Sequence, residues 1–179
     1  MLDLTIQTDQ TVAMPEAPYV ARHFIDGQYH DSADGRTSDR VSPSHGIVVS
    51  RAALGTASET GAAIAAARRA FDDGCWSDLS GKERAIVLNR VADLIEANAL
   101  ELAVLGVRDN GTEIGMAFKA EPLSAVATIR YYAEAIDKLY GEIAPTDPSV
   151  LALVHRAPVG VVGAIVPWNF PLMIGAWKV

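Results

Sequence analysis

The chain has 179 residues, of which 50% are hydrophobic and 21% are charged, so it holds enough apolar material to bury a core. Its formal net charge of -7 and isoelectric point near 5.0 argue against nucleic acid or an anionic membrane as a partner, since phosphate binding needs clustered lysine and arginine. One cysteine, Cys75, excludes an internal disulfide, and a cytoplasmic protein is expected.

The amino-terminal segment is expected to form a flexible tail over residues 1–20. It contains no lysine or arginine, whereas a secretory signal begins with basic residues. Two short β-prone runs between residues 23 and 30 flank Asp26-Gly27, a pair that favours a tight hairpin. A polar stretch at 31–40 gives little reason for a helix, and residues 47–54 are again β-prone. These segments predict a small antiparallel edge.

Three pairs of residues have the capping-box spacing that starts a helix, in which one side chain accepts a free amide and a carboxylate reaches back to another. Apolar residues follow the pairs at helical spacing, and Gly74 offers the first helix a left-handed ending. The middle of the chain is therefore predicted to be mostly helical. The three pairs are Thr56 with Glu59, Ser80 with Glu83, and Asn98 with Glu101.

A further helix is expected after the turn at Asn110-Gly111. It is predicted to open near Glu121-Pro122, because proline is favoured in the first turn of a helix, and to end at Gly141. Its inward face carries apolar residues at helical spacing: Val126, Ile129, Ala133, Ile136 and Leu139.

The pattern then changes to β-rich runs at residues 150–156 and 159–166, after a candidate linker at 142–149. The second run is apolar on both faces, as a strand buried inside a parallel sheet should be, and it leads into a loop at 167–171 and another helix. The predicted fold class is α/β, with a helical amino-terminal region leading into the first strand of a doubly wound parallel sheet.

The most specific run begins at Pro158 and reads Pro-Val-Gly-Val-Val-Gly-Ala-Ile-Val-Pro-Trp-Asn-Phe-Pro-Leu-Met-Ile-Gly-Ala-Trp-Lys. It resembles aldehyde dehydrogenases, in which a buried strand delivers a Pro-Trp-Asn-Phe-Pro turn to a cleft between cofactor and substrate. The resemblance covers roughly residues 22–178, because several further family signposts stand in order before this run. They include Phe24 to Gly27, Trp76, Asp109-Asn110-Gly111 and Arg130-Tyr131-Tyr132-Ala133.

The resemblance implies the amino-terminal part of the family's fold, with the sheet incomplete. Residues 21–144 and 158–179 would belong to the cofactor-binding domain, and residues 145–157 would form a linker and a bridging, oligomerising strand. The family's nucleophilic cysteine and general-base glutamate would lie in later segments, so the chain alone is expected to be inactive. Cys75 is interpreted as a structural thiol, because it lies in a helix-ending turn far upstream of the family nucleophile.

By the same resemblance, Asn169 is the oxyanion-stabilising residue. The implied reaction begins when a cysteine thiolate attacks an aldehyde and leaves a tetrahedral oxyanion, which a fixed amide donor stabilises. Pro167 and Pro171 favour a rigid loop around this asparagine. The plainer alternative is a loop asparagine that satisfies nearby backbone groups.

The resemblance also implies that four residues run alongside the cofactor, NAD or NADP, with backbone groups near its ribose and nicotinamide: Ile165, Val166, Pro167 and Trp168. Their alternative role is core packing, and both can hold. Gly160 and Gly163 do not form a dinucleotide fingerprint, since Gly-x-x-Gly lacks the required first pair.

Phe170, Ile174 and Trp177 are similar in position to residues that line the family's substrate tunnel, although their helical spacing suits core packing equally. Lys178 resembles the family lysine near the active centre, where it would contact the cofactor and take part in proton movement. An exposed lysine at a helix end is the alternative. The four histidines have no spacing that suits a metal ion, so no metal site is expected.

The function that the resemblance implies is oxidation of an aldehyde to a carboxylic acid with NAD or NADP, in a complete protein that forms a homo-oligomer, either a dimer or a tetramer. Two alternatives stay open. One is a non-catalytic interaction module that pairs residues 150–156 with a complete subunit. The other is a membrane-tethered domain through 157–177, an uncharged stretch that Pro158, Pro167 and Pro171 interrupt.

Overall fold

The computed structural model describes residues 18–179, so most of the tail predicted at 1–20 lies outside the described residues. Tyr19 and Val20 differ from that prediction, because they belong to strand β1 (Tyr19–Ala21). β1 pairs in parallel with β5 (Val48–Ala53), and β4 (Thr37–Val41) pairs antiparallel along the other edge of β5. The stretch at 31–40 is not helical, as expected, but its end joins a sheet because β5 supplies the hydrogen-bonding partner.

The predicted hairpin is confirmed in β2 (His23–Ile25) and β3 (Gln28–His30). Asp26 and Gly27 have φ angles of 53° and 76°, and a two-residue turn with positive φ at both positions matches the twist of the strands. The Asp26 carboxylate also lies 2.9 Å from Arg69 of α1 (Ala57–Asp72), which ties the hairpin to that helix.

Two of the three expected capping boxes are formed. Thr56 and Glu59 cap α1, and Ser80 and Glu83 cap α2 (Gly81–Ala97). The prediction at Asn98 is wrong in its hydrogen bonding, although α3 (Ala99–Asn110) does begin after this residue. The Asn98 side chain donates to the Leu94 carbonyl at 2.7 Å, so it closes the end of α2 instead of capping α3.

The helix expected to open at Glu121-Pro122 begins earlier than predicted. It runs through α4 (Ile114–Phe118), the π-helical turn η1 (Lys119–Leu123), α5 (Ser124–Ala135) and the 3-10 turn η2 (Ile136–Lys138), so it also ends before Gly141. Pro122 lies inside this helix. Its ring and its missing amide hydrogen would disrupt an ordinary α-helical turn, and the widened π-helical turn accommodates both.

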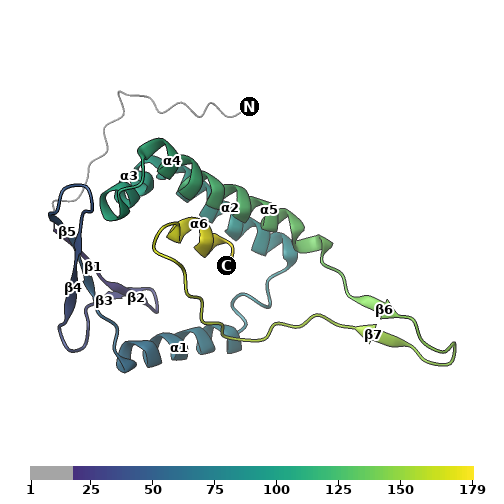
Figure 1. Cartoon of the computed structure of the whole chain (residues 1–179). Helices are drawn as coiled ribbons and strands as arrows, with labels where there is room; N and C mark the ends of the chain where they lie inside the picture. The colour runs from purple at the N-terminus through teal and green to yellow at the C-terminus, as the bar shows by residue number, and fades with distance from the viewer. Residues whose placement is uncertain (1–17) are drawn as a thin grey trace.

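The helical core lies where α2 crosses α5. Ala92, Val126 and Ile129 form its buried cluster, and Leu88, Ile95 and Ala176 pack against it. Ala176 belongs to α6 (Pro171–Ala176), so the carboxyl-terminal helix rests on this layer (Figure 1). α2, α5 and α6 therefore share one apolar layer.

A hairpin of β6 (Glu142–Ala144) and β7 (Ala152–Val154) projects away from the helices (Figure 1). The expected linker at 142–149 therefore begins with a strand, and the strand expected at 150–156 is shorter than predicted. Residues 159–166 form no strand, contrary to the prediction, and Val159 and Ile165 are 91% and 93% exposed. A parallel strand needs hydrogen-bonding neighbours, and no other strand pairs with this run among residues 18–179.

None of the helices within residues 18–179 combines the length and the apolar character needed to cross a membrane. The stretch at 157–177 contains α6, which has 6 residues.

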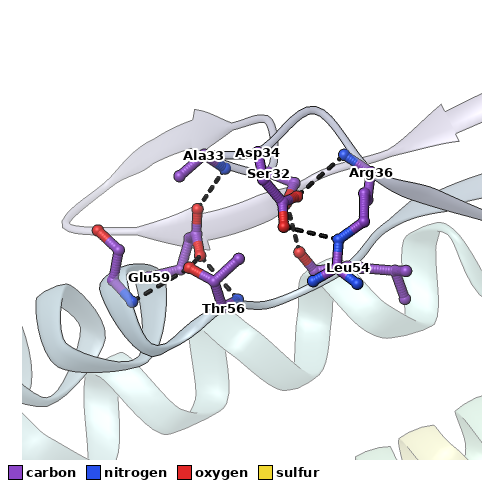
Figure 2. Close-up of polar contacts among 8 residues, drawn as sticks. Ser32, Ala33, Asp34, Arg36, Leu54, Thr56 and Glu59 are labelled. Carbon is purple, nitrogen blue, oxygen red and sulfur yellow. Dashed lines mark hydrogen bonds and ion pairs between the residues drawn. The ribbon is translucent and has the colours of Figure 1, made fainter.

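Glu59 ties the start of α1 to the loop before β4 (Figure 2). Its carboxylate accepts hydrogen bonds from the Thr56 hydroxyl, from the Thr56 amide and from the Ala33 amide, and these hold the pKa of Glu59 at about 2. In the same loop, the Ser32 hydroxyl 2.8 Å away is the main cause that lowers the pKa of Asp34 to about 2. Both side chains are therefore stabilised in their charged form by the fold.

This network predicts that acid destabilises the chain. Because the pKa values of Glu59 and Asp34 are lowered from 4.5 and 3.8, their contribution is complete above those values and is lost as the pH falls toward about 2. The urea midpoint should fall over this window, and Glu59→Gln should flatten part of the fall. Glu101→Gln is the matched control, because Glu101 has the same position in α3, where no capping box forms. An unchanged pH dependence in Glu59→Gln would contradict this prediction.

Candidate functional site

The turn at 167–171 delivers Asn169 to the start of α6. Pro171 occupies the first helical position, and Phe170 is the N-cap residue, with φ −140° and ψ 59°. A helix start leaves its first amides without internal partners, and a cap side chain normally supplies an oxygen to them. Phe170 has no side-chain oxygen, so the first amides of α6 need an acceptor from elsewhere.

Glu121 is that acceptor. One oxygen of its carboxylate, Oε2, accepts the backbone amides of Leu172 at 2.9 Å and of Met173 at 3.0 Å. Glu121 belongs to η1 and is 7% exposed, so the bonds are largely shielded from water. A charge-assisted pair of this kind is stronger than a bond between neutral groups.

Asn110 holds the other side of the turn. Its Oδ1 accepts the amide of Thr112 at 2.9 Å and the hydroxyl of Thr112 at 2.6 Å, which directs Nδ2 toward the carbonyl oxygen of Asn169 at 3.4 Å. The side chain of Asn169 is half-buried and has no hydrogen-bond partner among residues 18–179. Its amide group is therefore free to donate to a ligand.

The residues expected beside the cofactor form an open wall before this turn. Ile165 is 93% exposed, Trp168 79% and Val166 39%, and Pro167 is also exposed. Their backbone groups make no hydrogen bond to another part of the described chain. Lys178 is exposed at the end of α6, and its amide bonds the Gly175 carbonyl at 2.9 Å. The structure thus places the four residues in one exposed run, with Lys178 on the far side of α6.

The expected tunnel residues are divided by the structure. Trp177 lines an open depression of about 490 Å³ together with Tyr131, Tyr132 and residues of α5. Phe170 and Ile174 are half-buried and are not among the residues that line this depression. Of the three side chains, Trp177 alone lines this depression.

Sequence reasoning missed Glu121 and Asn110 as parts of this site, having interpreted both as local turn or helix-start residues. A signal was present: Phe170 before Pro171 leaves a helix start without a capping oxygen, which calls for an acceptor distant in sequence. Nothing in the spacing identifies Glu121 as that acceptor.

Cys75 lies in the turn after α1, exposed, with its Sγ 3.2 Å from the Ala70 carbonyl. Among residues 18–179, no hydrogen bond joins Cys75 to the turn that carries Asn169. In the part of the chain that the structure describes, no three His, Cys, Asp or Glu side chains gather as metal ligands would.

Comparison with known proteins identifies the family of this chain. The model of the aldehyde dehydrogenase family matches residues 29–179. Aminoacetaldehyde dehydrogenase of Pseudomonas aeruginosa is 42% identical over 158 residues, and the NADP/NAD-dependent aldehyde dehydrogenase PuuC of Escherichia coli is 45% identical over 157. Each match covers 88% of this chain and 32% of the relative.

Solved structures agree with the sequence matches. The P. syringae indole-3-acetaldehyde dehydrogenase AldA, solved in complex with NAD+ and IAA, superposes with a TM-score of 0.83 at 44% identity, over 88% of this chain and 32% of that one. The chain spans about a third of the length of the relatives it matches. Its mixed helices and partial sheets agree with an incomplete fold of that kind, and the chain belongs to the aldehyde dehydrogenase family.

Proposed function

We propose that this chain is the amino-terminal part of a cytoplasmic, homo-oligomeric enzyme that oxidises an aldehyde to a carboxylic acid with NAD or NADP. The observation that supports it best is Asn169, whose side-chain amide has no hydrogen-bond partner among residues 18–179, in a turn held on both sides. A donor prepared in this way stabilises an oxyanion without reorganising during the reaction.

In this proposal, a cysteine supplied by a later segment of the complete protein attacks the aldehyde carbon. Negative charge then develops on the aldehyde oxygen, and the Asn169 amide donates a hydrogen bond to that oxygen. A bound nicotinamide cofactor would supply the acceptor for the hydride that leaves the former aldehyde carbon. Water then hydrolyses the resulting thioester to the acid.

The open wall at 165–168 fits the edge of such a cofactor. Its backbone donors and acceptors have no partners elsewhere in the described chain, and Ile165 and Trp168 offer exposed apolar surface. Groups of this kind can bind the hydroxyls of a ribose and cover one face of a nicotinamide. Lys178, at the far end of α6, is assigned a role in cofactor contact and proton movement, and Phe170, Ile174 and Trp177 are assigned to the substrate tunnel.

The purified chain of residues 1–179 is expected to show no turnover, because its one cysteine lies in the turn after α1 and not beside Asn169. The measurement is NADH or NADPH formation with a panel of aldehydes. The control is the proposed complete protein, which should oxidise at least one of them. Turnover by residues 1–179 alone would overturn the proposal that a later segment supplies the nucleophilic cysteine.

A further inference from the structure

We propose that Glu121 is a positioning residue for Asn169, acting through the amides of α6, and that Asn110 assists it from the other side of the turn. The inference rests on the proposed role of Asn169 and names the groups that set its geometry. The proposal gives Glu121 no contact with substrate or cofactor, because its carboxylate is buried and bonded to backbone amides. Its effect passes through the backbone of residues 169–173.

α6 begins with backbone amides that have no partner inside the helix. Of the amides that α6 leaves without internal partners, Pro171 has none to offer, and the next two are those of Leu172 and Met173. Both point at Glu121 Oε2, at 2.9 and 3.0 Å. Glu121 therefore does for α6 what a capping side chain at Phe170 would do, but from a helix 51 residues earlier in the chain.

Glu121 reaches the start of α6 from a π-helical turn. It precedes Pro122 in η1, where the π-helical turn widens the helix and changes the direction of the side chains that follow α4. π-turns inside longer helices are often found at functional sites. Glu121 and Pro122 are buried, so this side of the widened turn faces protein, whereas Lys119 on the same turn is exposed.

The side chain of Glu121 is buried. A carboxylate that is 7% exposed is costly to place in a protein interior unless hydrogen bonds compensate it. Oε2 has its two amides, whereas Oε1 is buried without a partner among residues 18–179. An apolar side chain at this position would leave the amides of Leu172 and Met173 without this acceptor. The position is explained if the amides of α6 require a buried acceptor.

The two bonds that Glu121 Oε2 accepts from Leu172 and Met173, called the Glu121 clamp, act on Asn169 through the backbone. The Asn169 carbonyl is tied to Asn110 at 3.4 Å, the longest of the three contacts, and the amides that follow Pro171 are tied to Glu121. The peptide of Asn169 thus lies between two anchors on different helices. Oxyanion stabilisation depends on donors held within about 0.5 Å of the productive position, so loosening either anchor should cost rate.

The first experiment measures amide hydrogen exchange in the 1–179 chain. Glu121→Ala is expected to speed exchange at Leu172 and Met173 about tenfold or more, since both lose a charge-assisted bond. Glu121→Gln, which keeps an acceptor but not the charge, should fall between Glu121→Ala and the wild type. Unchanged exchange at both amides in Glu121→Ala would overturn the Glu121 clamp.

Glu113→Ala is the matched control. Glu113 accepts the amides of Gly115 and Met116, each at 2.8 Å, at the start of α4, so it makes the same pair of bonds in another place. Its replacement should speed exchange at Gly115 and Met116 and leave Leu172 and Met173 unchanged. If Glu113→Ala loosened α6 as much as Glu121→Ala did, the effect would be general destabilisation, and the inference would be wrong.

The second experiment measures steady-state kinetics in the complete protein. Glu121→Ala is expected to lower kcat between about tenfold and a hundredfold with little change in KM for the aldehyde, and Glu121→Asp to recover part of the loss. In an Asn169→Ala background, Glu121→Ala should lower kcat no further, because the donor it positions is gone. Additive losses would overturn the positioning role. If Asn169→Ala alone kept full kcat, the proposed function would fail, while the exchange measurement would still decide the Glu121 clamp.

Discussion

Asn169→Ala in the complete protein is expected to lower kcat for aldehyde oxidation about a hundred- to a thousand-fold, with a much smaller change in KM. The aldehyde oxygen carries a full charge only after the thiolate has added, so the lost bond matters in the transition state more than in the bound substrate. The structure supports this expectation because the Asn169 amide has no partner to lose among residues 18–179 and its backbone is anchored by Asn110 and Glu121.

Two further variants make the measurement specific to the donor. Asn169→Asp keeps the shape but replaces an amide donor with a negative charge, so it should be at least as damaging as alanine. Asn98→Ala removes an asparagine whose side chain bonds the Leu94 carbonyl at the end of α2, and it should lower stability slightly while leaving kcat unchanged. Burst and steady-state rates of NADH or NADPH formation would separate the chemical step from product release. A kcat within about twofold of the wild type for Asn169→Ala would contradict the oxyanion role.

Local chemistry made the amino-terminal half of the fold predictable. Asp26-Gly27 favours the hairpin it forms, and the Thr56–Glu59 and Ser80–Glu83 pairs start helices where their hydrogen bonds require. Asn98 shows the limit of such reasoning, because its side chain can serve the helix before it or the helix after it, and spacing does not choose between them. Pro122 shows another limit: proline favours a helix start, yet a π-turn admits it to a helix interior.

Long-range partners made the rest unpredictable. The apolar run at 159–166 has the composition of a buried parallel strand, but a strand forms only where neighbours accept its hydrogen bonds, and residues 18–179 provide none to it. The site shows the same division. Asn169 can be identified from the residues that flank it in the sequence. Glu121, in contrast, acquires its role from a helix start 51 residues later.

Ile129→Ala is expected to lower the free energy of unfolding of the 1–179 chain by roughly 2–5 kcal/mol, the range seen when a buried isoleucine is cut to alanine. Ile129 is 8% exposed and lies in the cluster with Ala92 and Val126, so cutting its side chain to alanine leaves a cavity among apolar neighbours. Small domains are stable by about 5–15 kcal/mol, so the variant should lose a large part of the total. Urea unfolding followed by far-ultraviolet circular dichroism measures the change.

The control for this variant is Ile86→Ala, which makes the same chemical change on α2 at a side chain that is 59% exposed, and it should change the free energy of unfolding by less than about 0.5 kcal/mol. Equal losses in the two variants would show that the cluster is not the core. The core and the site are also linked, because Ala176 seats α6 on the cluster that contains Ile129. Ile129→Ala should therefore speed hydrogen exchange at Leu172 and Met173 as well, by loosening the surface against which Glu121 holds the start of α6.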